Sequence, residues 1–274
     1  MGKPLVSLII SAYANVQYLN LVIKSITQQT DRRFEVIITE DAQHVHMEEY
    51  IRSIENHLNI KHLTQPDIGW QKNKALNRAI EAATTDYLVF IDEDCILHPR
   101  FMEYHIKLSE HNCVLAGKRI KLDPVTTQMI LENKLWVDDM NGYILKNFFK
   151  IKRQGAKFIE EGLFFNPNGV FKFIPKLRTM YQLKGCNMSF SRKAIYAING
   201  FDEDYSRPAI GEDIDLGWRF KRAGYKLRSL RNLAVQYHLY HKSGWNNQDE
   251  NIKMMQQKQA LDQFVCLNGL KKLQ

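Results

Sequence analysis

In Tyr87-Leu88-Val89-Phe90-Ile91-Asp92-Glu93-Asp94-Cys95, five residues of strand-forming type run directly into three acids. A continuous apolar run of this length predicts a fully buried strand, which is typical of a parallel sheet. The carboxyl end of such a strand is where an open α/β sheet binds its ligands. We therefore expect a ligand site at Asp92-Glu93-Asp94.

The three acids repel one another, so they need a compensating cation. Asp92 and Asp94 are two residues apart, and at a strand end they can point the same way. Their hard oxygen ligands suit Mg²⁺ or Mn²⁺, which keep open positions for phosphate oxygens. The tripeptide predicts a metal site for a diphosphate. A solvated acidic turn before Pro99 explains it equally well.

Length and composition are those of a globular protein of one large domain or two small ones, with 274 residues, 45% hydrophobic and 25% charged. No apolar run approaches the roughly 20 residues of a membrane span, and the N-terminus lacks the pattern of a secretory signal. The four cysteines form no CxxC pair, which favours free thiols in a reducing compartment. We therefore expect a cytoplasmic location.

The formal charge of +8 could attract phosphates, anionic lipid or nucleic acid. Because the basic residues are scattered rather than clustered, solubility alone also explains the charge. We expect no nucleic-acid partner.

Strands and helices alternate over the first 120 residues, which predicts a doubly wound, mostly parallel sheet flanked by helices. The expected strands are Leu5–Ile10, Phe34–Thr39, Ile60–Leu63, Tyr87–Ile91 and Val114–Lys118, and the expected helices lie around residues 19–26 and over Met47–Leu58, Gln71–Thr84 and Arg100–His111. The sequence contains neither GxGxxG, the signature of dinucleotide-binding folds, nor GxxxxGK[ST], the signature of P-loops. Both of these classes are therefore excluded.

Polar residues follow the first two strands. Ser11-Ala12-Tyr13-Ala14-Asn15 is typical of a ligand-facing loop. Asp41, after the next strand, could accept the imide N–H of a uracil or cap a helix. Lys72, Lys74 and Arg78 place basic groups near the nucleotide side, although a solvated helix face accounts for them too.

The pattern weakens over residues 121–184, where phenylalanines alternate with lysines and arginines. Such a segment can stack bases or sugars, or lie on a membrane surface. We favour a loop held on the core by its aromatic side chains.

Two later stretches carry candidate catalytic and metal-binding groups. Glu212 and Asp213 are expected to open a helix whose dipole favours their ionised form. A carboxylate that stays ionised can still act as a base for a sugar hydroxyl. His238 and His241 follow an expected strand, Leu233–Val235, and offer a third ligand to the metal.

At this point the motifs resemble those of family 2 glycosyltransferases with the GT-A fold. The resemblance is strongest to the branch that shares a carboxyl-terminal region with β-1,4-galactosyltransferases and bacterial chondroitin-type polymerases. The matching motifs are Ser11-Ala12-Tyr13, Glu40-Asp41, the segment from Gly69-Trp70-Gln71 to Asn77, Asp92-Glu93-Asp94, Gly185-Cys186-Asn187-Met188-Ser189, Gly211-Glu212-Asp213 and His238. They keep the family's order over roughly residues 4–245.

The resemblance implies a role for each matched residue. Ala12, Tyr13 and Asp41 would hold the uracil and ribose of a UDP-sugar, with Lys74 nearby and Asp92 toward the ribose or sugar. Asp94 and His238 would bind Mn²⁺ or Mg²⁺, with His241 as the alternative to His238. Asp213 would be the general base, and Glu212 would bind hydroxyls of the acceptor.

The resemblance also implies the organisation and the activity. Residues 1–120 would form the nucleotide-sugar half, 121–184 a variable insertion, 185–245 the acceptor and catalytic half of the same domain with a smaller antiparallel element, and 246–274 a helical tail. The implied function is inverting, metal-dependent transfer from a UDP-sugar to a hydroxyl of a saccharide or lipid-linked saccharide, in bacterial surface polysaccharide or lipopolysaccharide synthesis.

Two other classes of protein stay open. One is a catalytically silent sugar-binding protein on the same fold, and the other is a nucleotidyltransferase, whose glycine-rich phosphate loop is missing here. For the tail from Gln248 to Leu267 we favour packing on the body of the protein over contact with the inner face of a membrane.

Overall fold

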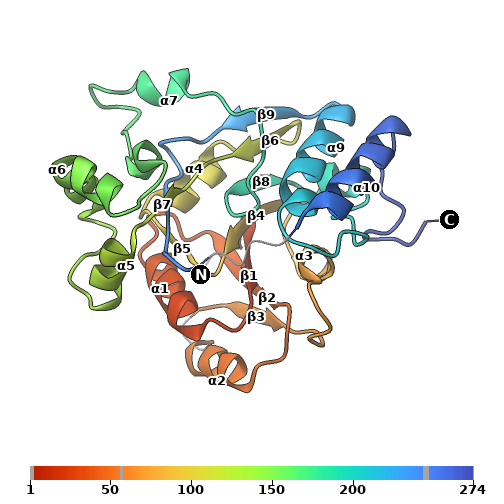
Figure 1. The fold of residues 1–274 in the computed structure, drawn as a ribbon, viewed down its shortest axis with the longest axis horizontal. Coiled ribbons are helices and arrows are strands. Elements are labelled where there is room, and N and C mark those ends of the chain that lie inside the picture. The colour runs from red at the N-terminus through yellow and green to blue at the C-terminus, as the bar shows by residue number, and fades with distance from the viewer. Residues whose placement is uncertain (1–2, 56–57, 243–246, 274) are drawn as a thin grey trace.

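The computed structural model describes residues 3–55, 58–242 and 247–273. Its centre is a seven-stranded sheet of order β3-β2-β1-β4-β8-β6-β9 (Figure 1). The strands are β1 (Val6–Ala12), β2 (Phe34–Glu40), β3 (Ile60–Leu63), β4 (Tyr87–Asp92), β6 (Cys113–Ala116), β8 (Met188–Ser191) and β9 (Lys226–Ser229). Only β8 runs antiparallel to its neighbours in this sheet of described strands. The mostly parallel sheet is therefore confirmed.

The acidic strand β4 lies in the middle of this sheet. It pairs in parallel with β1, with Ile9 opposite Phe90, and antiparallel with β8, with Phe90 opposite Met188. Its side chains from Tyr87 to Ile91 are all buried. The strand is thus covered on both faces, as its unbroken apolar run predicts.

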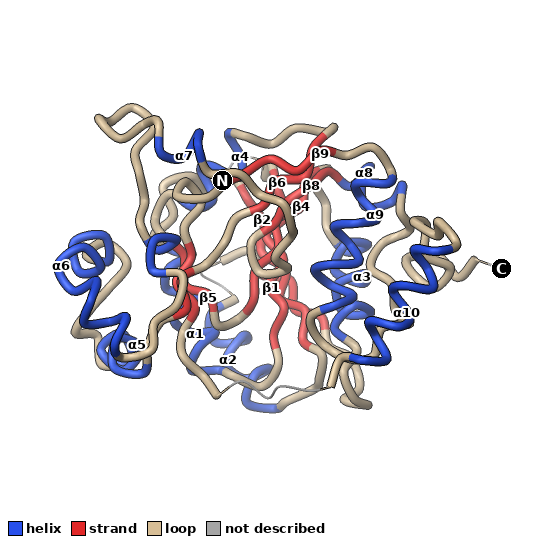
Figure 2. Tube along the Cα trace, turned by 45° about the horizontal axis from the view of Figure 1, so that its top comes forward, coloured by secondary structure: helices blue, strands red, loops and turns tan. Residues whose placement is uncertain are grey.

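Helices cover both faces of the sheet (Figure 2). The helices are α1 (Val16–Thr27), α2 (Val45–Ile54), α3 (Lys72–Ala82), α4 (Phe101–Lys107), α5 (Pro124–Leu131), α6 (Met140–Arg153), α7 (Ile174–Leu177), α8 (Arg192–Ala197), α9 (Leu216–Arg222) and α10 (Asp249–Ala260), with a 3₁₀ turn η1 (Ile159–Gly162) and a π-helical turn η2 (Ile210–Asp215). One hydrophobic cluster joins the sheet to α1, α2, α4, α5 and α6, and a second joins it to α3, α8 and α9.

A smaller sheet extends the carboxyl end of β4. It consists of β5 (Cys95–Leu97), β10 (Gln236–His238) and β7 (Ile120–Lys121). Strand β10 runs antiparallel to β5 and parallel to β7, so the element is mixed rather than wholly antiparallel. Its register sets His238 opposite Cys95, the residue after Asp94. This pairing carries a histidine from late in the chain to the acidic turn.

Several expected segments differ from the structure. Leu233–Val235 is not a strand, and His238 ends the strand that follows it. The expected helix Met47–Leu58 begins earlier and ends at Ile54, and residues 56–57 within it lie outside the described residues. In the tail, the helix ends at Ala260, and the residues after it fold back so that Cys266 is buried and Phe264 packs on the core. The expected packing of the tail therefore holds for Phe264 and Cys266, whereas Ile252 and Leu261 are exposed.

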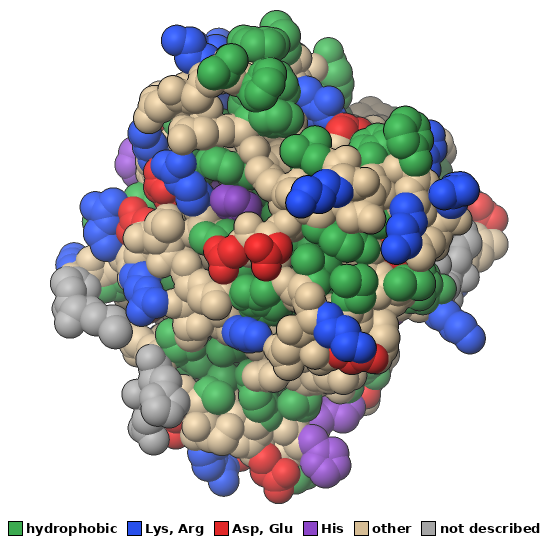
Figure 3. Space-filling view, turned by 90° about the vertical axis from the view of Figure 1, so that its left-hand side faces the viewer, with side chains coloured by type: hydrophobic (Ala, Val, Ile, Leu, Met, Phe, Trp, Pro, Cys, Tyr) green, Lys and Arg blue, Asp and Glu red, His purple; other side chains and the backbone are tan. Residues whose placement is uncertain are grey.

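The aromatic segment is only partly held on the core. Phe148 and Phe164 pack against the first hydrophobic cluster, but Phe149 is 77% exposed, and Phe171 and Phe173 are exposed beside α7. Figure 3 shows hydrophobic side chains gathered at the top of the molecule, over the segment that carries α7. The expectation of a loop held on the core by its aromatic side chains is therefore wrong for Phe149, Phe171 and Phe173, and the segment includes helices α6 and α7 rather than a loop alone. Among the described helices, none is long and apolar enough to cross a membrane.

Candidate active site

Asp94 meets two histidines at the carboxyl end of β4. Its Oδ2 atom lies 3.1 Å from His238 Nε2 and 3.0 Å from His241 Nε2. Burial alone would raise the pKa of Asp94, but the hydrogen bonds to His238 and His241 hold that pKa well below its usual value. The same carboxylate raises the pKa of His241. Asp94 thus forms one charged cluster with two histidines from late in the chain, His238 and His241.

This cluster fits a divalent cation. One ligand atom from each of Asp94, His238 and His241 lies within 4.8 Å of the others. A carboxylate with two imidazoles suits Mn²⁺ and other first-row transition metals better than Mg²⁺, which prefers oxygen ligands. These three side chains are the ones that would hold the ion.

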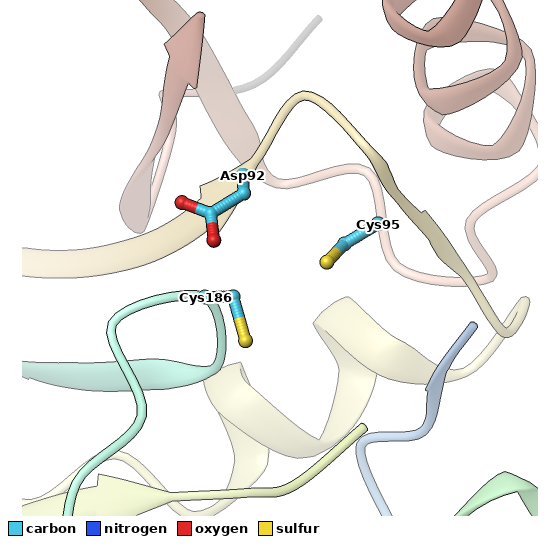
Figure 4. A group of neighbouring side chains, drawn as sticks. All are labelled: Asp92, Cys95 and Cys186. Carbon is cyan, nitrogen blue, oxygen red and sulfur yellow. The ribbon is translucent and has the colours of Figure 1, made fainter. Parts of the chain in front are cut away.

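A second group, Asp92, Cys95 and Cys186, has the same compactness (Figure 4). Both thiols are buried, and burial raises the pKa of Cys95 well above its usual value, so that thiol stays protonated. Lys72 Nζ and Arg119 Nη1 already lie 2.9 and 3.5 Å from the Asp92 carboxylate. Because two cations of the chain compensate Asp92, this group is the poorer place for a metal ion.

Lys72 joins the end of β4 to the π-helical turn. Its ammonium lies 2.9 Å from Asp92 Oδ1 and 3.0 Å from Glu212 Oε2. Burial alone would lower the pKa of Lys72, but the two carboxylates raise it well above its usual value. Glu212, predicted to grip an acceptor, is thus held by an ion pair in the same cluster as Asp92.

Asp213 lies half-buried beside Glu212. Its Oδ1 atom accepts a hydrogen bond from the backbone N–H of Gly185, and its Oδ2 atom lies 3.7 Å from Lys184 Nζ. A Cβ at position 185 would lie 2.9 Å from that Oδ1 atom, so a side chain there would displace the carboxylate. Burial, and next the charge of Glu212, raise the pKa of Asp213 to about 6. The expectation that a helix dipole would lower this pKa is wrong, because burial outweighs it.

Glu93, the middle acid, is compensated differently from its neighbours. Burial raises its pKa to about 7, although backbone N–H groups of Tyr13 and Asn15 oppose the rise. Its repulsion with Asp92 and Asp94 is relieved by partial protonation near neutral pH. The three acids therefore do not share one cation, and only Asp94 is left to a metal ion.

The predicted nucleotide side lies at the ends of β1 and β2. Asp41 is buried, and it accepts hydrogen bonds from Gln71 N at 2.8 Å and Gln65 Nε2 at 2.6 Å. Its backbone N–H donates to the carbonyl of Ala12 at 3.1 Å, and the exposed Tyr13 follows. Lys74 is exposed and lines a separate pocket with Trp70. The nucleotide roles of these residues stay predictions.

A pocket of about 750 Å³ opens beside Asp213. The described residues that line it are Lys118, Arg119, Lys121, Phe158, Thr179, Met180, Tyr181, Gln182, Lys184, Asp213 and Arg231. The sequence motifs do not include Arg119 and Lys121, although the basic run Lys118-Arg119-Ile120-Lys121 is a signal that could have indicated them. The site as a whole is that of an α/β enzyme with an acidic turn, two histidines beside it, and a half-buried carboxylate in a cationic pocket.

Comparison with known proteins supplies the family. The family model "Glycosyl transferase family 2" matches residues 7–173, and the model "N-terminal domain of galactosyltransferase" matches residues 170–242. The first match covers more than half of the chain. The chain therefore belongs to glycosyl transferase family 2, and the resemblance seen in its motifs is confirmed.

Similar curated proteins include polysaccharide synthases. Chondroitin synthase of Escherichia coli is 27% identical over 241 residues, which cover 85% of this chain and 34% of that protein. Hyaluronan synthase of Pasteurella multocida is 23% identical over 241 residues, which cover 85% of this chain and 24% of that protein. The chain thus spans about a third or less of the length of these relatives.

Solved structures share the fold. TarS residues 1–349 of S. aureus, in complex with UDP-GlcNAc, matches with a TM-score of 0.62 at 14% identity over 98% of this chain and 68% of that one. Mannosyltransferase PcManGT of Pyrobaculum calidifontis, in complex with GDP-Man and Mn²⁺, matches with a TM-score of 0.56 at 16% identity over 96% and 63%. The expected GT-A fold is confirmed.

The Lys72 bridge generates a stability prediction. Lys72→Met leaves the carboxylates of Asp92 and Glu212 without their shared partner in a place where both are largely buried. Removing one member of such a cluster costs about 3 kcal/mol. We expect a loss of this size in the free energy of unfolding, measured by urea denaturation.

The matched control is Lys74→Met, two residues along α3, where the lysine is exposed. Such a surface change should alter the free energy of unfolding by no more than about 0.5 kcal/mol. Equal stability of the two variants would contradict the bridge.

Proposed function

We propose that this chain transfers a sugar from a UDP-sugar to a hydroxyl of a saccharide acceptor, with inversion at the anomeric carbon and with a divalent cation. The observation that carries the proposal is the convergence of Asp94, His238 and His241 in one part of the site and of Asp92, Lys72, Glu212 and Asp213 in another. Asp92 and Asp94 lie at the carboxyl end of β4, and the carboxyl ends of parallel strands are where sheets of this class bind ligands.

The donor is expected at the ends of β1 and β2. The carboxylate of Asp41 is held in place by Gln65 and Gln71, and one of its oxygens can accept a hydrogen bond from the uracil imide. Asp92 and Lys74 complete the predicted contacts to the ribose, sugar and phosphates. UDP-GlcNAc in the TarS structure supports a uridine nucleotide, while GDP-Man in PcManGT shows that the fold also takes guanosine nucleotides.

The predicted metal ligands are Asp94, His238 and His241, and a Mn²⁺ or Mg²⁺ ion bound there supplies a Lewis acid for the charge that develops on the diphosphate. The protein's own groups then position the reactants. The Lys72 bridge fixes Glu212 beside Asp92, so an acceptor hydroxyl gripped by Glu212 is oriented toward the donor sugar.

Asp213 is the proposed general base. Its half-buried carboxylate is oriented by the Gly185 N–H, and its pKa of about 6 is close to working pH, where a base accepts a proton well and is still mostly ionised. It removes the proton of the attacking hydroxyl as UDP leaves from the opposite face. A single displacement of this kind turns an α-linked donor into a β-linked product.

The acceptor is expected to be a growing saccharide or a lipid-linked saccharide of a bacterial surface polysaccharide or lipopolysaccharide. The polysaccharide synthases among the relatives support this class. The expected cytoplasmic location, with contact at the inner face of the membrane, belongs to the same proposal.

The base generates a pH prediction. Because Asp213 must be ionised to accept a proton, kcat/KM should rise with pH through about 6 and level off above it. Asp213→Asn should lower kcat by about 100-fold or more while leaving UDP affinity unchanged. Initial rates of UDP release over a pH series measure both effects.

The control is Asp262→Asn, which removes a surface acid paired only with Arg222 among the described residues. Its rate and pH profile should match those of the unaltered protein. Normal turnover by the Asp213→Asn variant would show that another group is the base.

The metal cluster generates a binding prediction. Mn²⁺ should tighten the binding of UDP to the unaltered protein, and Asp94→Ala should remove that gain, because the carboxylate that draws both histidines together is gone. Calorimetric titration of UDP with and without Mn²⁺ measures the difference. Cys186→Ser, in the other cluster, should keep the full gain, and the opposite pattern would move the ion to Asp92, Cys95 and Cys186.

A further inference from the structure

The pocket beside Asp213 carries an excess of positive charge. Among the described residues that line it, five are basic and Asp213 alone is acidic. The five are Lys118, Arg119, Lys121, Lys184 and Arg231. Three of them stand in the basic run Lys118-Arg119-Ile120-Lys121, and the fold adds Lys184 and Arg231 from two later segments of the chain. Like charges held together in a partly enclosed space repel one another, and an anion relieves that repulsion.

Carboxylates of the chain compensate four of these cations. Arg231 is paired with the buried Glu161, which also lies 4.0 Å from Lys118 Nζ. Arg119 lies 3.5 Å from Asp92, and Lys184 lies 3.7 Å from Asp213.

Lys121 is different. It ends β7, its side chain is exposed, and no described carboxylate lies within ion-pair distance of its ammonium. Its backbone N–H and C=O both pair with Lys157 at 2.9 Å, which adds another cation beside it. Lys121 therefore presents an uncompensated positive charge to the pocket.

An aromatic ring lies in the same pocket at a strained backbone position. Phe158 has φ of +56° and ψ of +44°, which is the left-handed region that bulky residues rarely adopt. The pairing of Lys157 with Lys121 on one side and the hydrogen bond from Glu161 N to the Phe158 carbonyl on the other hold it there. Its side chain is nevertheless 53% exposed. A strained residue whose ring is left open to the pocket favours a role in binding over a role in packing.

We propose that this pocket binds an acidic sugar, one that carries a carboxylate or a phosphate, with the sugar ring against Phe158 and the anionic group toward Lys121. The inference rests on the proposed glycosyl transfer and names the substrate class of that site. The acidic sugar is either the sugar of the donor or the terminal sugar of the acceptor, and the two share the same chemistry of recognition.

The diphosphate of the donor is not the anion in question. The residues predicted to bind the nucleotide and the metal, Ala12, Tyr13, Asp41 and Asp94, are absent from the described lining of this pocket. The cations line the same pocket as Asp213, where the attacking hydroxyl is expected, and Lys184 Nζ lies 3.7 Å from the Asp213 carboxylate. A charged group recognised here belongs to a sugar beside the reacting bond.

The test compares two ligands that differ by one acidic group, methyl β-D-glucuronide and methyl β-D-glucoside. NMR titrations measure their affinities for the full chain with UDP and Mn²⁺ present, so that the nucleotide site is filled. We expect the glucuronide to bind about tenfold more tightly, as one charge-assisted hydrogen bond provides. A parallel arm measures the affinities of UDP-glucuronic acid and UDP-glucose in the presence of Mn²⁺. Tighter binding of UDP-glucuronic acid would indicate that the donor carries the acidic sugar.

Two variants separate the charge from the ring. Lys121→Gln should abolish the preference for the acidic ligand, while Lys146→Gln, on the exposed face of α6, should keep it. Phe158→Asn, which tolerates the left-handed backbone, should weaken the acidic and the neutral ligand alike. Because Lys121 is exposed, Lys121→Gln should leave the melting temperature unchanged, and Phe158→Asn should not lower it, since asparagine adopts the left-handed backbone more readily.

The outcomes show whether the acidic sugar belongs to the acceptor or to the donor, and one of them would overturn the proposal. A preference in the glycoside arm assigns the acidic sugar to the acceptor, and a preference in the nucleotide arm assigns it to the donor. Equal binding of the acidic and the neutral ligand in both arms overturns the proposal. Binding of UDP with Mn²⁺ in the same samples reports on the proposed function, so a failure there is distinguished from a failure of the pocket.

Discussion

Three negative charges at the end of a buried strand are the constraint around which this fold is arranged. Each is compensated by a different means: Asp92 by Lys72 and Arg119, Glu93 by a pKa raised to about 7, and Asp94 by His238 and His241. Because the compensating groups come from α3, from the segment after β6 and from the end of β10, satisfying the strand end also assembles the site. The ion pair of Lys72 with Glu212 then extends the same network to Asp213.

Backbone pairing sets the positions of these charges. The antiparallel register of β10 on β5 places His238 beside the acidic turn, and the parallel pairing of β10 with β7 brings Lys121 to the same edge. Strand β8 enters between β4 and β6, so Gly185, just before it, can donate its N–H to Asp213. The predicted metal ligands, the predicted base and the cationic pocket therefore share one scaffold, which suits the proposed reaction, in which a hydroxyl must be aligned with a leaving diphosphate.

The sequence predicts the buried strand, the alternation of the first 120 residues and the acids and histidines of the site, because periodicity and strand-end acids are local signals. It does not show which cation meets which acid, since Lys72 and Lys74 look alike on one helix and only tertiary packing buries the first. It also misplaces the pKa of Asp213, where burial outweighs the helix dipole. The basic run Lys118-Arg119-Ile120-Lys121 is a local signal for part of the cationic pocket, but its junction with Lys184 and Arg231 and the strained Phe158 depend on contacts between distant segments.

The account depends most on one divalent ion held by Asp94, His238 and His241. Anomalous X-ray diffraction from crystals grown with Mn²⁺ and UDP tests this directly, because it locates the ion independently of any activity. We predict a single strong manganese peak within coordination distance of the Asp94 carboxylate and of His238 Nε2, next to the diphosphate. A peak between Asp92, Cys95 and Cys186, or bound UDP with no manganese beside Asp94, would contradict the account.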